Sequence, residues 1–250
     1  MIELSHLCAG YGCKQVLYDI SARLERGKLI GIIGPNGCGK STLLKTISRL
    51  HPIMSGSIVI DGVPAATMRA QIHARHIAYV SQGRRIPDMT VGQLVLHGRY
   101  PHLQFPRRYS EHDRRIASAA METLGILDVA EQPLYALSGG MRQSAYLAMA
   151  LAQETDCILL DEPTTYLDIS HQVSLMYLLR RLTKDGKGIA AVMHDLPLAL
   201  TYADEIWVMK DGHLLQSGTP KQICDTGIPE NLFGVAVTYE NGNYYYRFRV

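Results

Sequence analysis

Hydrophobic residues recur along this chain in two patterns, and the first part of the chain follows the pattern of strands. Residues 15–24 alternate between apolar and polar side chains, which predicts a strand with one buried face. The residues expected on that face are Val16, Tyr18, Ile20, Ala22 and Leu24. Short apolar runs at residues 29–33, 57–60 and 77–80 predict three further strands.

The pattern changes to helical spacing in the middle of the chain. Strand signals vanish between residues 90 and 154, and apolar positions with helical spacing occupy 90–99, 110–124 and 141–154. Short apolar runs return at 157–160, 188–192 and 206–209, of the kind that lie buried in a parallel sheet. The chain therefore predicts an α/β domain that is interrupted by a helical insert.

The end of the chain carries a hairpin signal. Asn241-Gly242 separates residues 235–240 from residues 243–250, and this dipeptide favours a type I′ turn. We therefore divide residues 1–250, as a single domain, into three parts. Residues 1–89 and 156–234 form an α/β core with a β subdomain, residues 90–155 a helical subdomain, and residues 235–250 a C-terminal hairpin.

The first chemical motif lies between the predicted strand 29–33 and a predicted helix over 41–49. It reads Gly34, Pro35, Asn36, Gly37, Cys38, Gly39, Lys40, Ser41, followed by Thr42. This fits G-x-x-x-x-G-K-[ST], in which glycines let backbone N–H groups point at phosphates. Lys40 supplies a positive charge for the β- and γ-phosphates, and the Ser41 hydroxyl can ligate Mg²⁺. GTPases, kinases, helicases and transport ATPases share this loop, so it indicates a nucleotide and leaves the reaction open.

A second motif places two acids at the end of a buried strand. Asp161 and Glu162 directly follow the apolar run 157–160, at the sheet edge where α/β proteins bind ligands. Asp161 is a candidate ligand of Mg²⁺, and Glu162 is a candidate to polarise an attacking water. Next to a phosphate loop, this pair indicates phosphoryl transfer rather than two solvated acids.

The third motif, Leu137-Ser-Gly-Gly-Met-Arg-Gln143, opens the predicted helix 141–154. Its backbone N–H groups and helix dipole make a second anion site. With this motif the chain resembles the ABC transporter ATPase family, whose signature is the LSGG element. The resemblance covers essentially the whole chain, and a P-loop kinase or GTPase would not explain the motif.

The resemblance implies a fold and a mode of assembly. The fold is an α/β P-loop NTPase with a RecA-like parallel-sheet core, an antiparallel β subdomain and an inserted α-helical subdomain. Two copies pair head to tail, and each ATP lies between the phosphate loop of one copy and the signature of the other. Such a homodimer has two equivalent sites.

The resemblance also implies residue roles. Tyr11 is similar to the aromatic residue that stacks on adenine, Gln82 to the glutamine that reaches Mg²⁺, and Asp168 to an acid that communicates across the dimer. His194 is similar to the switch histidine at the γ-phosphate. The expected catalytic residues are Glu162, His194 and Lys40, and the expected metal ligands are Ser41, Gln82 and Asp161. ATP is expected to contact Tyr11, residues 34–42, Gln82, Ser138, Gly139, Gly140 and Asp168.

Composition restricts the setting in which these residues act. The formal charge of +2 is too near neutral to suggest a nucleic-acid partner. No apolar run reaches the roughly 18 residues of a membrane span, and the N-terminus does not read as a signal peptide. The five cysteines form no C-x-x-C pair, which fits a reducing compartment. The resemblance to ABC transporter ATPases implies, within this setting, a peripheral protein that a permease holds on the cytoplasmic face of the plasma membrane.

Two segments indicate a branch of the family. Residues 97–102 and 161–172 resemble ATPases of importers for iron-siderophore complexes, haem and cobalamin. We therefore expect a permease, contacted through residues 84–107, and indirectly a substrate-binding protein as partners. A vitamin importer with a separate membrane subunit for its substrate stays open. So does a soluble ABC ATPase, although the fused cassettes or long coiled coil of that class are not visible here.

Overall fold

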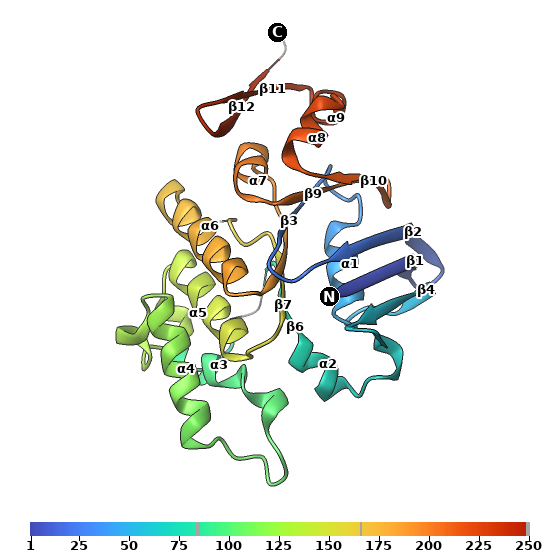
Figure 1. The fold of residues 1–250 in the computed structure, drawn as a ribbon. Helices are drawn as coiled ribbons and strands as arrows, with labels where there is room; N and C mark the ends of the chain where they lie inside the picture. Colours follow the sequence, from blue (N-terminus) through green and yellow to red (C-terminus); the bar gives the residue numbers. More distant parts are fainter. Residues whose placement is uncertain (84–85, 166, 249–250) are drawn as a thin grey trace.

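A six-stranded sheet forms the centre of the molecule in the computed structural model, which describes residues 1–83, 86–165 and 167–248 (Figure 1). The strand order is β10-β9-β3-β8-β7-β6, and only the β9–β10 pairing is antiparallel among these described strands. The strands are β3 (Leu29–Ile33), β6 (Ile77–Val80), β7 (Cys157–Asp161), β8 (Gly188–Val192), β9 (Glu205–Lys210) and β10 (His213–Gly218). The short apolar runs thus form the buried parallel sheet that their composition predicts.

A second, antiparallel sheet covers one face of the central sheet. Its strand order is β2-β1-β4-β5, and helix α1 (Lys40–Ile47) packs with it in one buried cluster (Figure 1). The strands are β1 (Ile2–Tyr11), β2 (Lys14–Leu24), β4 (Ile53–Ile60) and β5 (Val63–Pro64). The strand that precedes the phosphate loop and the helix that follows it are therefore both fixed by buried packing.

The predicted buried face of residues 15–24 is wrong in its first half. Leu17 is fully buried, whereas Tyr18 is exposed. The reason is a bulge in β2. Leu7 pairs with Ile20 and Ala9 with Leu17, so β2 has one extra residue in this stretch, where Asp19 has a φ of +52°. An extra residue reverses the side-chain alternation, so Ile20 and Leu24 are buried as predicted and Val16 and Tyr18 are not.

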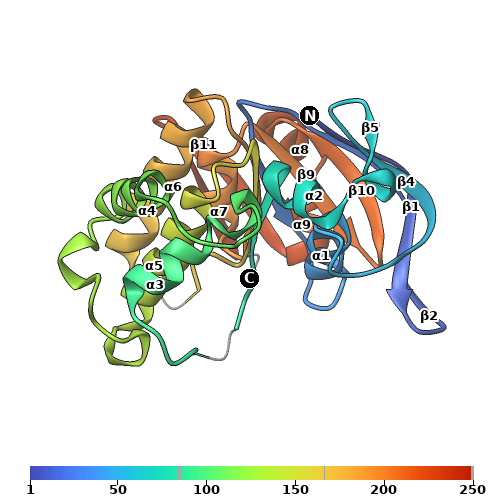
Figure 2. The ribbon, with the colours of Figure 1, turned by 90° about the horizontal axis from the view of Figure 1, so that it is seen from below.

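Helices cover the opposite face of the central sheet. They are α5 (Gly139–Ala152), α6 (Ile169–Lys184) and α7 (Leu196–Tyr202), which share a second buried cluster with the sheet. Helix α5 also packs with α3 (Val91–His97) and α4 (Glu111–Thr123) in a third cluster. Figure 2 shows α3, α4, α5 and α6 on one side of the molecule and β1, β2 and β4 on the other.

The remaining elements are short. They are α2 (Ala70–His76), α8 (Pro220–Asp225), α9 (Ile228–Phe233), β11 (Val235–Glu240), β12 (Asn243–Phe248) and the 3₁₀ turns η1 (Ala65–Thr67), η2 (Tyr100–His102), η3 (Leu127–Val129) and η4 (Leu134–Ala136). β11 and β12 pair as the predicted hairpin, and its Asn241 and Gly242 both have the positive φ of a type I′ turn.

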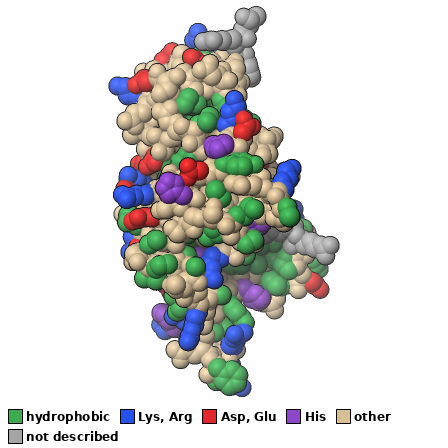
Figure 3. All heavy atoms as spheres, turned by 90° about the vertical axis from the view of Figure 1, so that its right-hand side faces the viewer, with side chains coloured by type: hydrophobic (Ala, Val, Ile, Leu, Met, Phe, Trp, Pro, Cys, Tyr) green, Lys and Arg blue, Asp and Glu red, His purple; other side chains and the backbone are tan. Residues whose placement is uncertain are grey.

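The helices α3, α4 and α5 all fall in the predicted insert, between β6 and β7 in the chain order. The boundaries that we place at residues 90, 156 and 235 stay predictions. Among the described residues, no helix is both long enough and apolar enough to span a membrane. Positively and negatively charged side chains are interspersed on the face that Figure 3 shows.

Candidate active site

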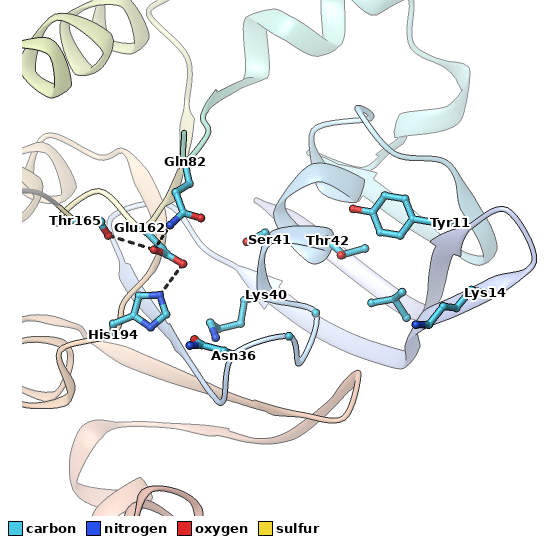
Figure 4. Close-up of a pocket in the computed structure, with 13 residues that line it drawn as sticks. Tyr11, Lys14, Asn36, Lys40, Ser41, Thr42, Gln82, Glu162, Thr165 and His194 are labelled. Atoms are coloured by element: carbon cyan, nitrogen blue, oxygen red, sulfur yellow. Dashed lines mark hydrogen bonds and ion pairs between the residues drawn. The ribbon is translucent and has the colours of Figure 1, made fainter. Parts of the chain in front are cut away.

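A cleft of about 760 Å³ opens where the carboxyl ends of β3, β7 and β8 meet the β1–β2 hairpin (Figure 4). Parallel strands present their carboxyl ends along one edge, which brings together loops that are far apart in the sequence. The described residues that line the cleft are Tyr11, Lys14, Val16, Asn36, Gly37, Gly39, Lys40, Ser41, Thr42, Gln82, Glu162, Thr165 and His194.

The phosphate loop has a backbone shape that only glycine accepts at two points. Gly34 has a φ of +154°, and a Cβ there would lie 2.1 Å from the Met209 carbonyl oxygen. Gly39 has a φ of +103° and lies directly before α1. Because side chains are excluded at both points, the loop wraps closely around the start of α1.

Lys40 is the first residue of α1 and is 5% exposed. Its Nζ donates hydrogen bonds to the carbonyl oxygens of Gly34 at 2.7 Å and Pro35 at 2.9 Å. The charge therefore lies inside the curve of the loop, at the cleft. Cys38 is buried in the same loop, and burial raises the pKa of its thiol.

Asp161 lies beneath the cleft at the end of β7 and is 3% exposed. The Ser41 hydroxyl donates to its Oδ1 at 2.8 Å, and the Tyr79 hydroxyl donates to its Oδ2 at 3.1 Å. Motifs 120 residues apart thus place a hydroxyl oxygen and a carboxylate oxygen side by side. Two adjacent oxygens of this kind suit a hard divalent cation.

Glu162 is the point at which the cleft's polar groups converge. Gln82 Nε2 and the Thr165 hydroxyl, the latter at 3.2 Å, both donate to its Oε2, while His194 Nε2 lies 2.6 Å from its Oε1 (Figure 4). The Glu162 backbone has a φ of +53°, which is rare for a residue with a side chain. Strained backbones of this kind cluster at active sites, where the surrounding contacts impose them.

Tyr11 lies at the opposite end of the cleft from Glu162, as Figure 4 shows. It ends β1, and 51% of its surface is exposed. An aromatic ring at this end and phosphate-binding groups at the other provide for the two halves of a nucleotide.

Four residues of the site were not predicted as site residues from the sequence. Thr165 and Tyr79 bind the two acids, and Lys14 and Val16 line the cleft near Tyr11. Thr165 follows Glu162 by three residues and could have been found from that spacing. No sequence signal marked Tyr79, because its role depends on the parallel register of β6 and β7.

The third motif does not line this cleft. Ser138 is the N-cap of α5, and its hydroxyl accepts from the backbone N–H of Met141 at 3.3 Å. The helix begins at Gly139, two residues before the predicted start. Gly139 borders a separate hollow of about 480 Å³ beside Ser81 and Gly83. The N–H groups of Ser138, Gly139 and Gly140 are therefore separated from the phosphate loop of the same chain.

Asp168 also lies outside the cleft. It caps α6 and accepts hydrogen bonds from the backbone N–H of His171 at 2.9 Å and from the Ser170 hydroxyl at 2.8 Å. These bonds, led by the His171 backbone bond and side chain, lower the pKa of Asp168 to about 2. The carboxylate is therefore ionised and exposed at neutral pH.

Pro35 and Cys38 belong to the loop without lining the cleft, and Gly34 lines a neighbouring apolar hollow next to His194. Of the predicted site residues, the loop, Tyr11, Gln82, Asp161, Glu162 and His194 are thus brought together. The signature residues and Asp168 are not.

Comparison with known proteins agrees with this geometry. The family model described as ABC transporter matches residues 17–165. The chain is 42% identical to the ferric enterobactin transport ATP-binding protein FepC of Escherichia coli (strain K12), over 92% of this chain and 85% of that protein. It is 39% identical to the iron(3+)-hydroxamate import ATP-binding protein FhuC of Bacillus subtilis (strain 168), over 94% of this chain and 88% of that protein.

A solved structure extends the likeness to three dimensions. The structure of a metal-chelate type ABC transporter in an inward-facing conformation superposes with a TM-score of 0.83 and 25% identity. The match covers 99% of this chain and 96% of that one, so it includes the C-terminal hairpin as well as the central sheet.

Proposed function

This chain belongs to the ABC transporter family and is an ATP-hydrolysing subunit, and we propose that it powers an importer of iron(III) chelates of the siderophore class. The observation that carries hydrolysis is the convergence of Gln82, Thr165 and His194 on Glu162 at the edge of the phosphate-loop cleft. The proposal for the cargo rests on the relatives.

Glu162 acts as the general base. A carboxylate at the cleft, opposite the phosphate loop, can accept a proton from a water that attacks the γ-phosphorus. The new P–O bond forms as the bond to the β-phosphate oxygen breaks, and ADP and phosphate leave. His194 and Gln82 hold both oxygens of Glu162, which fixes the direction in which the carboxylate points. Accepting a proton requires one of these contacts to open.

Lys40 and the loop backbone bind the phosphates. The Lys40 ammonium now rests on the Gly34 and Pro35 carbonyl oxygens, and a phosphate chain in the loop offers it a charged acceptor instead. Tyr11 takes the adenine at the other end of the cleft. Positioning and electrostatic stabilisation thus account for most of the catalysis.

The residues at the loop fit Mg²⁺. The adjacent Ser41 hydroxyl and Asp161 carboxylate oxygens are the hard ligands that this ion prefers, and the Gln82 amide could supply a third oxygen. When bound, Mg²⁺ neutralises charge on the β- and γ-phosphates. Asp161 is held for this task by Tyr79 on the neighbouring strand.

A second copy of the chain completes the site. Ser138, Gly139 and Gly140 form an anion-binding helix start that is remote from their own phosphate loop. In a head-to-tail homodimer they cover the γ-phosphate of the partner's ATP, and the exposed Asp168 faces the partner. ATP binding closes the dimer, and hydrolysis reopens it.

The segment 84–107 is the proposed contact with the permease. It exposes Phe105 to 95%, together with Ile86 and Tyr100. Arg84 and Arg85, at the start of the expected contact, lie outside the described residues. Because Gln82 touches Glu162, movement of the permease can reach the base. The protein then lies on the cytoplasmic face of the plasma membrane, held there by the permease, with a substrate-binding protein as an indirect partner.

The cargo is inferred from relatives of different ligand chemistry. One relative is a ferric enterobactin transport ATP-binding protein, and the other is an iron(3+)-hydroxamate import ATP-binding protein. The feature common to the two named cargoes is iron(III). No residue of this chain is expected to contact the chelate, so the exact siderophore is set by the permease and its binding protein.

Two measurements test the proposal. Affinity purification of the tagged chain from detergent-solubilised native membranes should recover a many-spanning permease by mass spectrometry. Deletion of the coding sequence should abolish uptake of radiolabelled iron(III) siderophore, and the wild-type chain but not Glu162→Gln should restore it.

The outcomes separate the parts of the proposal. Loss of haem or cobalamin uptake, with iron uptake intact, would show an importer with another cargo. Recovery of ribosomal or DNA-repair proteins without a permease would overturn the importer and assign the ATPase to a soluble machine.

A further inference from the structure

The ring of Tyr11 packs against the imidazole ring of His51. His51 lies in the connection between α1 and β4, and its ring centroid is 4.2 Å from that of Tyr11 at an interplanar angle of 40°. His51 is not among the described residues that line the cleft, so it reaches a bound nucleotide only through Tyr11.

His51 is itself held by the strand that carries Tyr11. Its Nε2 lies 2.6 Å from the carbonyl oxygen of Gly10. A carbonyl oxygen only accepts, so Nε2 carries the proton and donates. The imidazole therefore has a fixed tautomer and a fixed ring plane.

The Gly10 carbonyl belongs to the paired part of the β1–β2 hairpin. Gly10 pairs with Gln15 next to the tip of the β1–β2 hairpin, and a Cβ on Gly10 would lie 2.1 Å from the Lys14 carbonyl oxygen. The hairpin thus closes tightly at the residue before Tyr11. A side chain at residue 10 would therefore not fit between the two strands.

Tyr11 needs such support because it is half exposed at a hairpin tip. A free ring at this position would occupy several rotamers and lose that freedom when a base stacks on it. We propose that His51 is a positioning residue for the nucleotide base, which holds the Tyr11 ring ready to stack and ties the base end of the cleft to the helix α1 that starts in the phosphate loop. This inference rests on the proposed role of Tyr11 in the ATPase.

The inference makes a prediction about which kinetic constant changes. Stacking is made with the base in both the ground state and the transition state, so its loss raises KM and leaves kcat unchanged. His51→Ala should raise KM for ATP, and the Kd of a fluorescent ATP analogue, about threefold to tenfold, as expected for one aromatic contact. His51→Phe, which keeps a ring, and His51→Gln, which keeps a donor, should each recover part of the loss.

The controls separate positioning from general damage. Leu50→Ala changes an exposed side chain in the same connection and should behave as wild type. Inorganic triphosphate, which has no base, should compete equally well against His51→Ala and wild type. In a Tyr11→Ala background, His51→Ala should have no further effect.

Each contrary outcome has a distinct meaning. A wild-type KM and Kd in His51→Ala, with a raised KM in Tyr11→Ala, would overturn this inference alone. Weaker triphosphate binding in His51→Ala would also overturn it, because the defect would then lie in the phosphate loop. Unchanged binding in Tyr11→Ala would overturn both this inference and the proposed role of Tyr11. Absence of ATP hydrolysis by the wild type would count against the proposed function, while the binding measurement would still decide the role of His51.

Discussion

At the scale of single residues, Glu162 combines a strained backbone with a carboxylate whose two oxygens are both engaged. Its backbone φ is +53°. Its side chain contacts Gln82, Thr165 and His194, which lie in three different loops. A carboxylate held in this way has little freedom to lose when the reaction begins. Replacing this carboxylate by an amide should therefore impair turnover and leave ATP binding intact.

We expect Glu162→Gln to lower kcat for ATP hydrolysis by about 10²–10⁴-fold, because an amide cannot take the proton from water. ATP binding should persist, and the variant should accumulate as an ATP-bound dimer in size-exclusion chromatography. Glu131→Gln, at an exposed position in the helical insert, is the matched control. Normal hydrolysis by Glu162→Gln would show that another group is the base.

The reactivity of Cys38 is a single-residue test of how tightly the phosphate loop is packed. Its thiol is 6% exposed, and burial raises its pKa, so the reactive thiolate is scarce at neutral pH. We expect iodoacetamide at pH 7.5 to alkylate Cys38 at least about tenfold more slowly than the exposed Cys13, by mass spectrometry of the peptides. Equal rates would contradict the packing of this loop and would show that reagents reach the Cys38 thiol.

At the scale of elements, the helical insert depends on one buried charge pair. Arg99, after α3, donates from Nε to Asp113 Oδ1 at 3.0 Å, and Asp113 also completes the Ser110 capping box of α4. Arg99 Nη1 further reaches the Ala152 carbonyl oxygen and Glu154 Oε2, both at 2.7 Å. One guanidinium thus joins the ends of α3, α4 and α5.

Asp113→Asn should lower the free energy of unfolding by about 3 kcal/mol at pH 7, because it leaves a buried guanidinium short of its partner. Burial would raise the pKa of Asp113, but hydrogen bonds from Ser110 and Arg99 outweigh it and hold the pKa at about 2. This is below the unfolded value of about 3.9, so the stabilisation is present above pH 4 and is lost as the pH falls towards 2.

Urea titrations at several pH values check this prediction. The difference in unfolding free energy between wild type and Asp113→Asn should narrow steadily below pH 4. Asp128→Asn, an exposed acid of the same insert, should show little difference at any pH. A gap that stayed constant down to pH 2 would show that the charge of Asp113 is not what stabilises the insert.

At the scale of the whole molecule, the phosphate loop and the signature belong to different regions. Lys40 lies at the carboxyl edge of the central sheet, whereas Ser138 starts a helix that packs with the insert. The two anion sites are separate within one chain, which is the geometric basis for a shared site between two copies.

Mixing two inactive variants tests this arrangement. Lys40→Ala and Ser138→Arg should each be inactive as homodimers, since every site contains one damaged motif. In an equal mixture, the heterodimer has one site with both motifs intact, so about a quarter of wild-type activity should return if the sites act independently. No recovery after confirmed subunit exchange would contradict the head-to-tail site.

The sequence by itself determined the local chemistry and the class of fold. The loop from Gly34 to Ser41, the acids at the end of β7 and the helix start within residues 137–143 could be predicted, because each is a short motif whose backbone shape depends on neighbouring residues. The buried parallel strands were equally legible, since strands covered on both faces are apolar throughout.

Tertiary structure decided what depends on register and distance. The bulge at Asp19 reversed the first half of the predicted face of β2, because one extra residue inverts the alternation of side chains between its two sides. Tyr79 contacts Asp161, 82 residues further along the chain, because β6 and β7 pair in parallel. His51 contacts Tyr11 because it lies just before β4, which pairs with β1. No sequence motif marks either contact. Separation of Ser138 from Lys40 likewise appears only when the helices are placed on the sheet, because chain order carries no information about distance across a fold.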